Sequence, residues 1–99
     1  MVNISVDRAR IEAFCRRHGI VKLAFFGSIL RADFDNESDI DVLVEFDAAH
    51  VPGLFGIARM ERELSIILDG RRADIRTAED LSRYFRPDVL KDAVVQYAA

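Results

Sequence analysis

The chain has little of what marks secreted, disulfide-stabilised or membrane-spanning proteins. It has 99 residues, with one cysteine, two prolines and no tryptophan. A single cysteine excludes an internal disulfide, and no apolar run approaches the ~20 residues of a membrane span. The N-terminus lacks a signal-peptide pattern, so we expect a cytoplasmic protein without a membrane partner.

The charge balance also limits the choice of ligand. The net charge is −3 at pH 7, which argues against duplex DNA because a duplex-binding surface is basic. Hydrophobic residues make up 51% of the chain and charged residues 31%, as in a globular protein. We therefore expect one domain over residues 1–99, with Cys15 as a small core residue.

Two aspartates follow a glycine–serine pair at a defined spacing. Gly27 and Ser28 end an apolar strand, and Asp39 and Asp41 begin another after ten intervening residues. Alternate residues of a strand share a face, so the two carboxylates point the same way, roughly 7 Å apart at Cβ. Such a pair can share the hard divalent cations of two-metal phosphoryl chemistry. The opposite face of the strand is apolar and favours burial.

The glycine–serine pair is suited to a phosphate group. Gly27 has no Cβ, so a phosphate can approach the backbone closely. Ser28 offers a hydroxyl, and neighbouring N–H groups at the start of a short helix can point at an anion. Together with the carboxylates, the pair predicts a site for a nucleoside triphosphate.

This spacing resembles the signature of the nucleotidyltransferase superfamily that includes DNA polymerase β, and especially its minimal nucleotidyltransferase (MNT) domains. The resemblance spans nearly the whole chain. The family pattern usually reads Gly-Ser-Arg-x-Arg-Gly, but here Ile29 and Ala32 replace the first arginine and the last glycine. Only Arg31 is retained, either as a phosphate contact or as an exposed loop arginine. The pattern therefore predicts fewer cations for the phosphates.

The periodicity of apolar residues predicts three strands and four helices. Packed in layers, these elements predict an α+β (α/β layered) domain with helices on one face of the sheet. The resemblance implies that this domain has the nucleotidyltransferase fold, with a small mixed sheet. In the first half we expect a helix over 5–18, capped by Ser5 or Asp7 and ended by Gly19, then a strand over 20–26, a turn and loop over 29–38, and a strand over 39–46. A second helix runs from Pro52 to Asp69-Gly70, with an apolar stripe of Leu54, Ile57, Leu64 and Leu68. A strand over 71–77, a Thr77–Asp80 capping pattern and a helix from Pro87 follow, and Leu90, Ala93, Val94 and Tyr97 share a face of that last helix.

A third carboxylate lies in the predicted strand over 71–77. Asp74 alternates with apolar neighbours, and by itself it reads as a strand-edge aspartate paired with Arg72 or Arg76. The resemblance implies instead that Asp74 completes a triad with Asp39 and Asp41. In that role Asp74 assists metal binding and accepts the proton of the attacking hydroxyl.

Several other residues have a structural and a functional interpretation. We expect the structural one for His18 at the end of the first helix, for Glu61 within the apolar stripe, paired with a nearby arginine, and for the acids of the 29–38 loop (Asp33, Asp35 and Glu37), which fail the calcium-loop pattern. Tyr84 and Phe85 either pack under the last helix or form an exposed patch.

The resemblance implies the reaction and its participants. It implies Mg²⁺-dependent nucleotidyl transfer, with two Mg²⁺ ions held by the three aspartates, ATP as the nucleotide donor, and pyrophosphate as the leaving group. MNT domains are often encoded beside HEPN toxins and act as their antitoxins, in some pairs by adenylylating a tyrosine of the toxin. The chain is too short to contain a second, acceptor-holding domain, so we expect a HEPN-type protein partner in a homo- or hetero-oligomer.

The residues are also compatible with two other functions. The chain is alternatively a module that neutralises its partner by docking, with weak or no catalysis. A small-molecule nucleotidyltransferase is less favoured because an acceptor domain is lacking, and a polymerase-like role is disfavoured by the acidic balance.

Overall fold

A four-stranded sheet forms the centre of the computed structural model, which describes residue 4 and residues 6–32, 34–35 and 37–99. Its strands are β1 (Ile20–Phe26), β2 (Ile40–Phe46), β3 (Ala73–Arg76) and β4 (Val94–Ala98). They lie in the order β3-β2-β1-β4; β2 and β3 are parallel and the other neighbours are antiparallel. The predicted mixed sheet is thus confirmed.

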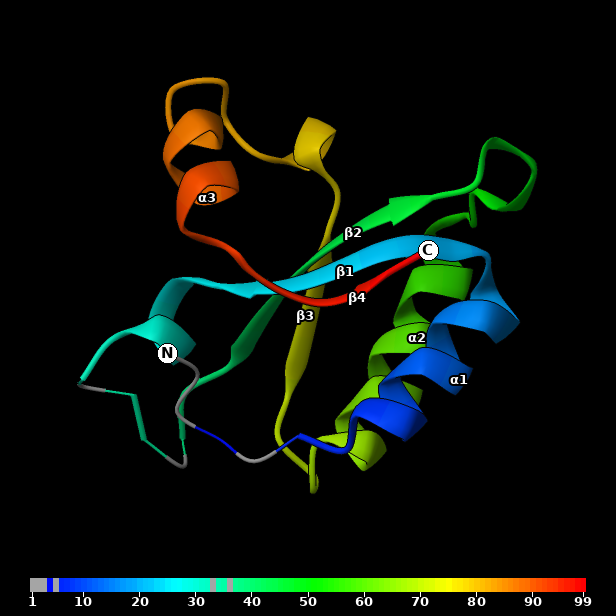
Figure 1. The fold of residues 1–99 in the computed structure, drawn as a ribbon, viewed down its shortest axis with the longest axis horizontal. Helices are drawn as coiled ribbons and strands as arrows, with labels where there is room; N and C mark the ends of the chain where they lie inside the picture. Colours follow the sequence, from blue (N-terminus) through cyan, green and yellow to red (C-terminus); the bar gives the residue numbers. More distant parts are fainter. Residues whose placement is uncertain (1–3, 5, 33, 36) are drawn as a thin grey trace.

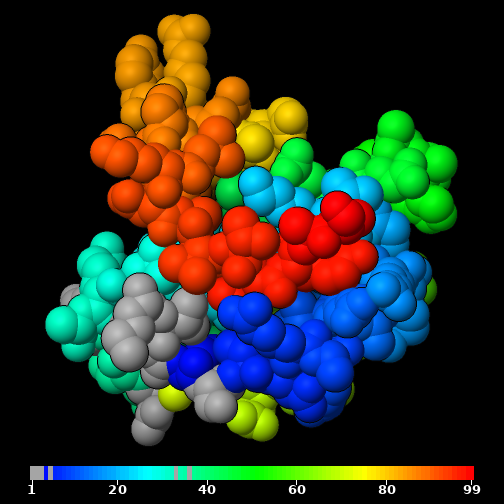
Figure 2. Space-filling view, viewed as in Figure 1, coloured from blue at the N-terminus to red at the C-terminus, as the bar shows by residue number. Residues whose placement is uncertain are grey.

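Two long helices cover one face of the sheet. These are α1 (Arg8–His18) and α2 (Leu54–Ile67), which lie side by side in Figure 1. A shorter helix, α3 (Arg86–Asp92), precedes β4, and the short 3₁₀ turns are η1 (Gly27–Leu30), η2 (Ala48–His50) and η3 (Ala78–Asp80). Figure 2 shows the segment that contains α3 standing out from the body of the molecule above β4. Within the described ranges, no helix has the length and apolar character that a membrane crossing requires.

The core fills the space between the sheet and the two long helices. Phe14 from α1, Phe25 from β1 and Leu64 from α2 are fully buried, and Ile40 and Val42 from β2 join them. Cys15 is also fully buried, as predicted. Because β2 turns its apolar side chains toward the helices, its alternate residues face the open side of the sheet.

Helix α1 begins later than the sequence indicated. Its N-cap is Asp7, whose carboxylate accepts the N–H of Arg10, and Ser5 lies outside the described residues. Gly19 ends the helix with φ of +67°, as predicted. Of the two predicted caps, Asp7 is thus the one that the structure shows, and the helix runs from Arg8 rather than from residue 5.

The predicted start of α2 was wrong, and its predicted apolar stripe is confirmed for Ile57, Leu64 and Leu68 but not for Leu54. Gly53 is the N-cap, so Pro52 precedes the helix, and the first helical residue, Leu54, is 89% exposed. The buried face is centred on Met60, Leu64 and Ile67. Leu54 lies at the border of this buried face, where its side chain meets solvent.

The predicted C-terminal helix was also wrong beyond Asp92. The helix α3 is seven residues long, and Val94–Ala98 forms β4, which pairs with β1. The spacing of apolar residues fitted a helix, but β-branched and aromatic side chains favour a strand when an unpaired strand edge is available. Over the described residues, the domain therefore has four strands and three α-helices, whereas the sequence predicted three strands and four helices.

The remaining expectations concern short segments. Strand β2 begins at Ile40 and β3 spans only Ala73–Arg76, so both are shorter than predicted. Thr77 and Asp80 form the predicted capping box, which opens η3. Tyr84 and Phe85 are 77% and 67% exposed, so they form an exposed patch.

Candidate functional site

The turn after β1 brings the backbone against a carboxylate of β2. Gly27 has φ of +72°, in the left-handed region that favours glycine, and Ile29 of the following turn is fully buried. A Cβ at Gly27 would lie 3.2 Å from Cγ of Asp41 and closer still to Oδ2. A side chain at residue 27 would therefore displace the Asp41 carboxylate.

Asp41 and Asp74 lie on neighbouring strands at the same level. They are register partners in the parallel pair formed by β2 and β3, and both side chains are half-exposed. Asp39 immediately precedes β2 and is exposed. Because Ile40 and Ile75 are buried on the helix side, the carboxylates face the open side of the sheet. The structure thus brings together the three aspartates that the sequence singled out.

The charges of Asp74 and Asp39 act on the Asp41 carboxylate. Burial raises the pKa of Asp41 above its ordinary value, and the negative charges of Asp74 and Asp39 raise that pKa further. The Arg76 guanidinium and the backbone N–H of Ser28 act in the opposite direction by stabilising the ionised form. A cation placed among these carboxylates would relieve their repulsion.

Ser28 holds Asp39 and Asp41 in place. Its hydroxyl donates to the backbone carbonyl of Asp39 over 3.1 Å, and its N–H donates to the Asp41 side chain. We predicted a phosphate contact for the Ser28 hydroxyl. In this structure the hydroxyl is bound within the site, so Ser28 links the Gly27 turn to the start of β2.

Two arginines, Arg72 just before β3 and Arg76 at its end, pair with the carboxylates. Nη2 of Arg76 lies 3.0 Å from Oδ2 of Asp74, and Nη1 of Arg72 lies 3.8 Å from Oδ1 of Asp39. The sequence offered these arginines only as partners for Asp74. Each arginine is two residues from Asp74, and this spacing was the sequence signal that both lie on the same face as the aspartates.

The donor chemistry of the site fits Mg²⁺. Carboxylate oxygens are the ligands that this cation prefers, and the burial of Asp41 acts together with the charges of Asp74 and Asp39 to raise its pKa. Across the described part of the chain, no three His, Cys, Asp or Glu side chains are arranged to hold one metal ion. The arginine pairs of Asp39 and Asp74 would have to open before these carboxylates could turn toward a shared cation.

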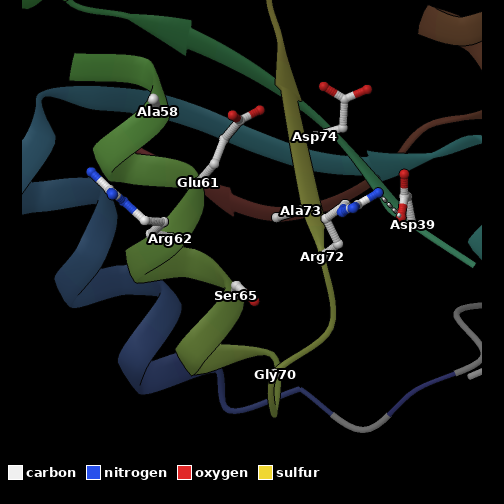
Figure 3. A pocket seen from close by; sticks show the side chains of 9 residues that line it. All are labelled: Asp39, Ala58, Glu61, Arg62, Ser65, Gly70, Arg72, Ala73 and Asp74. Atoms are coloured by element: carbon white, nitrogen blue, oxygen red, sulfur yellow. Dashed lines mark ion pairs between the residues drawn. The ribbon is translucent and has the colours of Figure 1, made fainter. Parts of the chain in front are cut away.

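Two clefts open beside the carboxylates. One has a volume of about 520 Å³ and lies between α2 and β3, where Asp39, Asp74 and Arg72 share its lining with Ala58 and Ser65 (Figure 3). The other has a volume of about 610 Å³ and lies between η1 and α3; it includes Gly27 and Arg31. Arg31 is therefore beside the Gly27 turn, on a different cleft from Asp74.

The structural interpretation holds for the other residues named from the sequence. Oε2 of Glu61 accepts the backbone N–H of Ile75 over 2.8 Å, so its partner is a strand backbone and not the predicted arginine. His18 is partly buried, and its Nε2 lies 2.7 Å from Glu63, which also pairs with Arg17. Asp35 and Glu37 are exposed loop residues, and Asp33 lies outside the described residues.

Comparisons with known proteins place this chain among nucleotidyltransferase domains. A family model described as a nucleotidyltransferase domain matches residues 8–97. A Methanocaldococcus jannaschii protein provisionally named a protein adenylyltransferase is 30% identical over 94% of this chain and 97% of its own. The protein adenylyltransferase MntA of Thermococcus cleftensis is 31% identical over 91% of this chain and 88% of its own.

Solved structures share the fold. A protein provisionally described as a minimal nucleotidyltransferase superposes with a TM-score of 0.71 at 34% identity, covering 88% of this chain and 86% of its own. A toxin–antitoxin complex solved with AMP-PNP contains a chain that superposes with a TM-score of 0.74 at 18% identity, covering 95% and 75%. At that identity the second likeness shows a common fold alone.

Proposed function

Because the chain belongs to the nucleotidyltransferase domain family, we propose that it is an ATP-dependent protein adenylyltransferase and the antitoxin of a HEPN-type toxin. The observation that carries the proposal is the register pairing of Asp41 with Asp74, directly against the Gly27 turn. This arrangement places acidic side chains beside a stretch of backbone that a phosphate group can approach.

In the proposed reaction the chain binds a triphosphate and moves one proton. Asp39, Asp41 and Asp74 would hold Mg²⁺, which when bound would neutralise charge on the phosphate oxygens. Gly27 would admit a phosphate close to its backbone, and Arg31 would contact the phosphates from the neighbouring cleft. Ser28 keeps Asp39 and Asp41 in place through its two hydrogen bonds. Asp74 would accept the proton of the acceptor hydroxyl.

The relatives support the choice of a protein acceptor. Two of them carry the name protein adenylyltransferase, and structures of the same fold include an MntA–HepT toxin–antitoxin pair. We infer that this chain likewise assembles with a HEPN-type toxin and transfers AMP to it. Since ATP is the proposed donor, we place the reaction in the cytoplasm.

A label-transfer assay tests this function. Purified protein is incubated with Mg²⁺ and α-labelled ATP, with and without the HEPN-type protein encoded beside it. We expect label on the partner with the wild-type chain and none with Asp39→Ala or without Mg²⁺. A stable complex that never becomes labelled would contradict the proposed transfer.

A second candidate, a docking module with weak or no catalysis, is favoured by one observation. The arginine pairs of Asp39 and Asp74 already neutralise part of the charge that a cation would neutralise. Under this alternative, an Asp39→Ala/Asp41→Ala double variant would still neutralise the toxin. Under the proposed function, the same variant would form the complex and fail to protect against the toxin.

A further inference from the structure

The cleft between α2 and β3 contains an open strand edge. β3 is the last strand in the order β3-β2-β1-β4, so among the residues that the structure describes only one of its two edges pairs with a strand. The other edge faces α2, and Ala73 lines the cleft there together with Ala58 and Ser65 (Figure 3). An open edge inside a cleft offers backbone hydrogen-bonding groups to an extended segment.

The hydrogen bonds show which groups of β3 face this cleft. The carbonyl of Arg72 accepts the N–H of Ile40, so it points toward β2. The N–H of Ile75 points the other way, because it donates to Glu61 of α2. Backbone groups alternate along a strand, so the N–H and C=O of Ala73 share the direction of the Ile75 N–H.

We propose that this cleft is the acceptor subsite, and that the acceptor protein enters it as an extended segment which pairs with Ala73 at the open edge of β3. The inference rests on the proposed function, because it assigns a place to the protein acceptor of that reaction. The occupant is a short stretch of the partner that carries a hydroxyl side chain.

Strand pairing would direct the acceptor hydroxyl toward Asp74. Directly opposed residues of paired strands place their side chains on the same face of the sheet, with Cβ atoms about 4.5–5.5 Å apart. The Asp74 side chain lies on the open face, and Asp74 also lines the cleft. A hydroxyl-bearing residue opposite Asp74 would therefore lie beside its carboxylate, which is where a proton acceptor is needed.

The position of the second cleft agrees with this assignment. In-line transfer requires the attacking hydroxyl and the leaving pyrophosphate on opposite sides of the α-phosphorus. The Gly27 turn belongs to the other cleft, whereas Asp74 belongs to this one. The hydroxyl oxygen bonds to the α-phosphorus, its proton goes to Asp74, and the bond to pyrophosphate breaks with its electron pair on the leaving oxygen.

Glu61 limits the length of the added segment. Its carboxylate accepts the Ile75 N–H, so that N–H is already bonded. The added segment therefore pairs with the outward N–H of Ala73, two residues earlier. β3 is four residues long, which also favours a short pairing. The subsite therefore selects a brief extended stretch, such as a loop or a terminal tail of the partner.

Two variants in the cleft, with one control, test the subsite. Ala58→Trp fills the cleft from α2, and Ala73→Pro removes the outward N–H from an edge strand, where proline is tolerated. Ile66→Trp is the control, since Ile66 is 68% exposed and lines a different cleft of the same helix. We expect both cleft variants to raise the KM for the HEPN-type partner about tenfold or more, with unchanged affinity for a fluorescent ATP analogue.

Amide exchange at Ala73 provides a readout that does not need transfer. Adding the partner should slow exchange of the Ala73 N–H in the wild-type chain and in Asp39→Asn. Slowed exchange without any transfer would support the subsite and contradict the proposed reaction. Transfer at wild-type rate by both cleft variants, or transfer without protection of Ala73, would overturn the subsite and leave the proposed reaction standing.

Discussion

Gly27 is the residue on which the close approach between backbone and carboxylate depends. Gly27 and Gly70 both have positive φ, +72° and +84°, but only at Gly27 would a Cβ meet Asp41; at Gly70 it would meet nothing within 4 Å. Gly70→Ala should therefore cost only the backbone strain, about 1–2 kcal/mol of unfolding free energy. Gly27→Ala should cost more and should also weaken binding of the ATP analogue with Mg²⁺.

Chemical denaturation and nucleotide titration of the two variants separate these effects. The shared strain cancels in the comparison, so the difference in nucleotide affinity reports the displaced Asp41 carboxylate. Equal nucleotide affinity in Gly27→Ala and Gly70→Ala would show that the close approach has no part in nucleotide binding.

Cys15 offers a second test at the residue scale. Its side chain is fully buried, and burial raises the pKa of the thiol from 9.0 to about 12. We expect Ellman's reagent, at about pH 8, to react with Cys15 only as fast as the native chain opens. Rapid labelling under native conditions, at the rate seen in denaturant, would contradict the burial of this side chain.

The same pKa fixes the sign of a pH effect on stability. As the pH rises, the unfolded chain loses the thiol proton first, with a pKa of 9.0, whereas the native chain loses it with a pKa of about 12. The contribution of this thiol to the free energy of unfolding is complete below 9.0 and falls above it. Cys15→Val removes this thiol, so its free energy of unfolding should fall less between about pH 8 and alkaline pH than that of the wild-type chain.

At the scale of elements, α2 shows how a leucine stripe is divided between core and surface. Leu64 is fully buried in the core, whereas Leu54, predicted for the same stripe, is 89% exposed to solvent. Leu64→Ala should lower the free energy of unfolding by about 2–5 kcal/mol. Leu54→Ala should change it by less than about 0.5 kcal/mol. Similar losses in the two variants, measured by urea denaturation, would mean that Leu54 is also part of the core.

The sequence predicted most elements where one signal dominated. Gly19 ended α1 and the alternation in β2 buried Ile40 and Val42, as expected. The predicted start of α2 was wrong because Pro52 precedes the helix without joining it. The sequence did not predict β4 because residues 94–98 fit both a helical and a strand period. The edge of β1, with which they pair, decides between the two.

At the scale of the whole molecule, the candidate site combines distant segments through the sheet. The spacing from Gly27 to Asp41 was readable because one loop and one strand set it. The pairing of Asp41 with Asp74 depends on the register between β2 and β3, which the family resemblance implied and the structure provides. The pairs of Arg72 and Arg76 with the aspartates depend on side-chain conformation, which a sequence pattern does not specify.

The central claim is that the face of the sheet bearing Asp39, Asp41 and Asp74 transfers AMP to a protein. The most direct measurement is the intact mass of the HEPN-type partner after incubation with ATP and Mg²⁺, using the wild-type chain, Asp74→Asn, and Asp47→Asn as an exposed control outside the site. We predict that the wild-type chain and Asp47→Asn add AMP to the partner, and that Asp74→Asn does so about 10²–10⁴-fold more slowly. Transfer by Asp74→Asn at the wild-type rate would contradict the account.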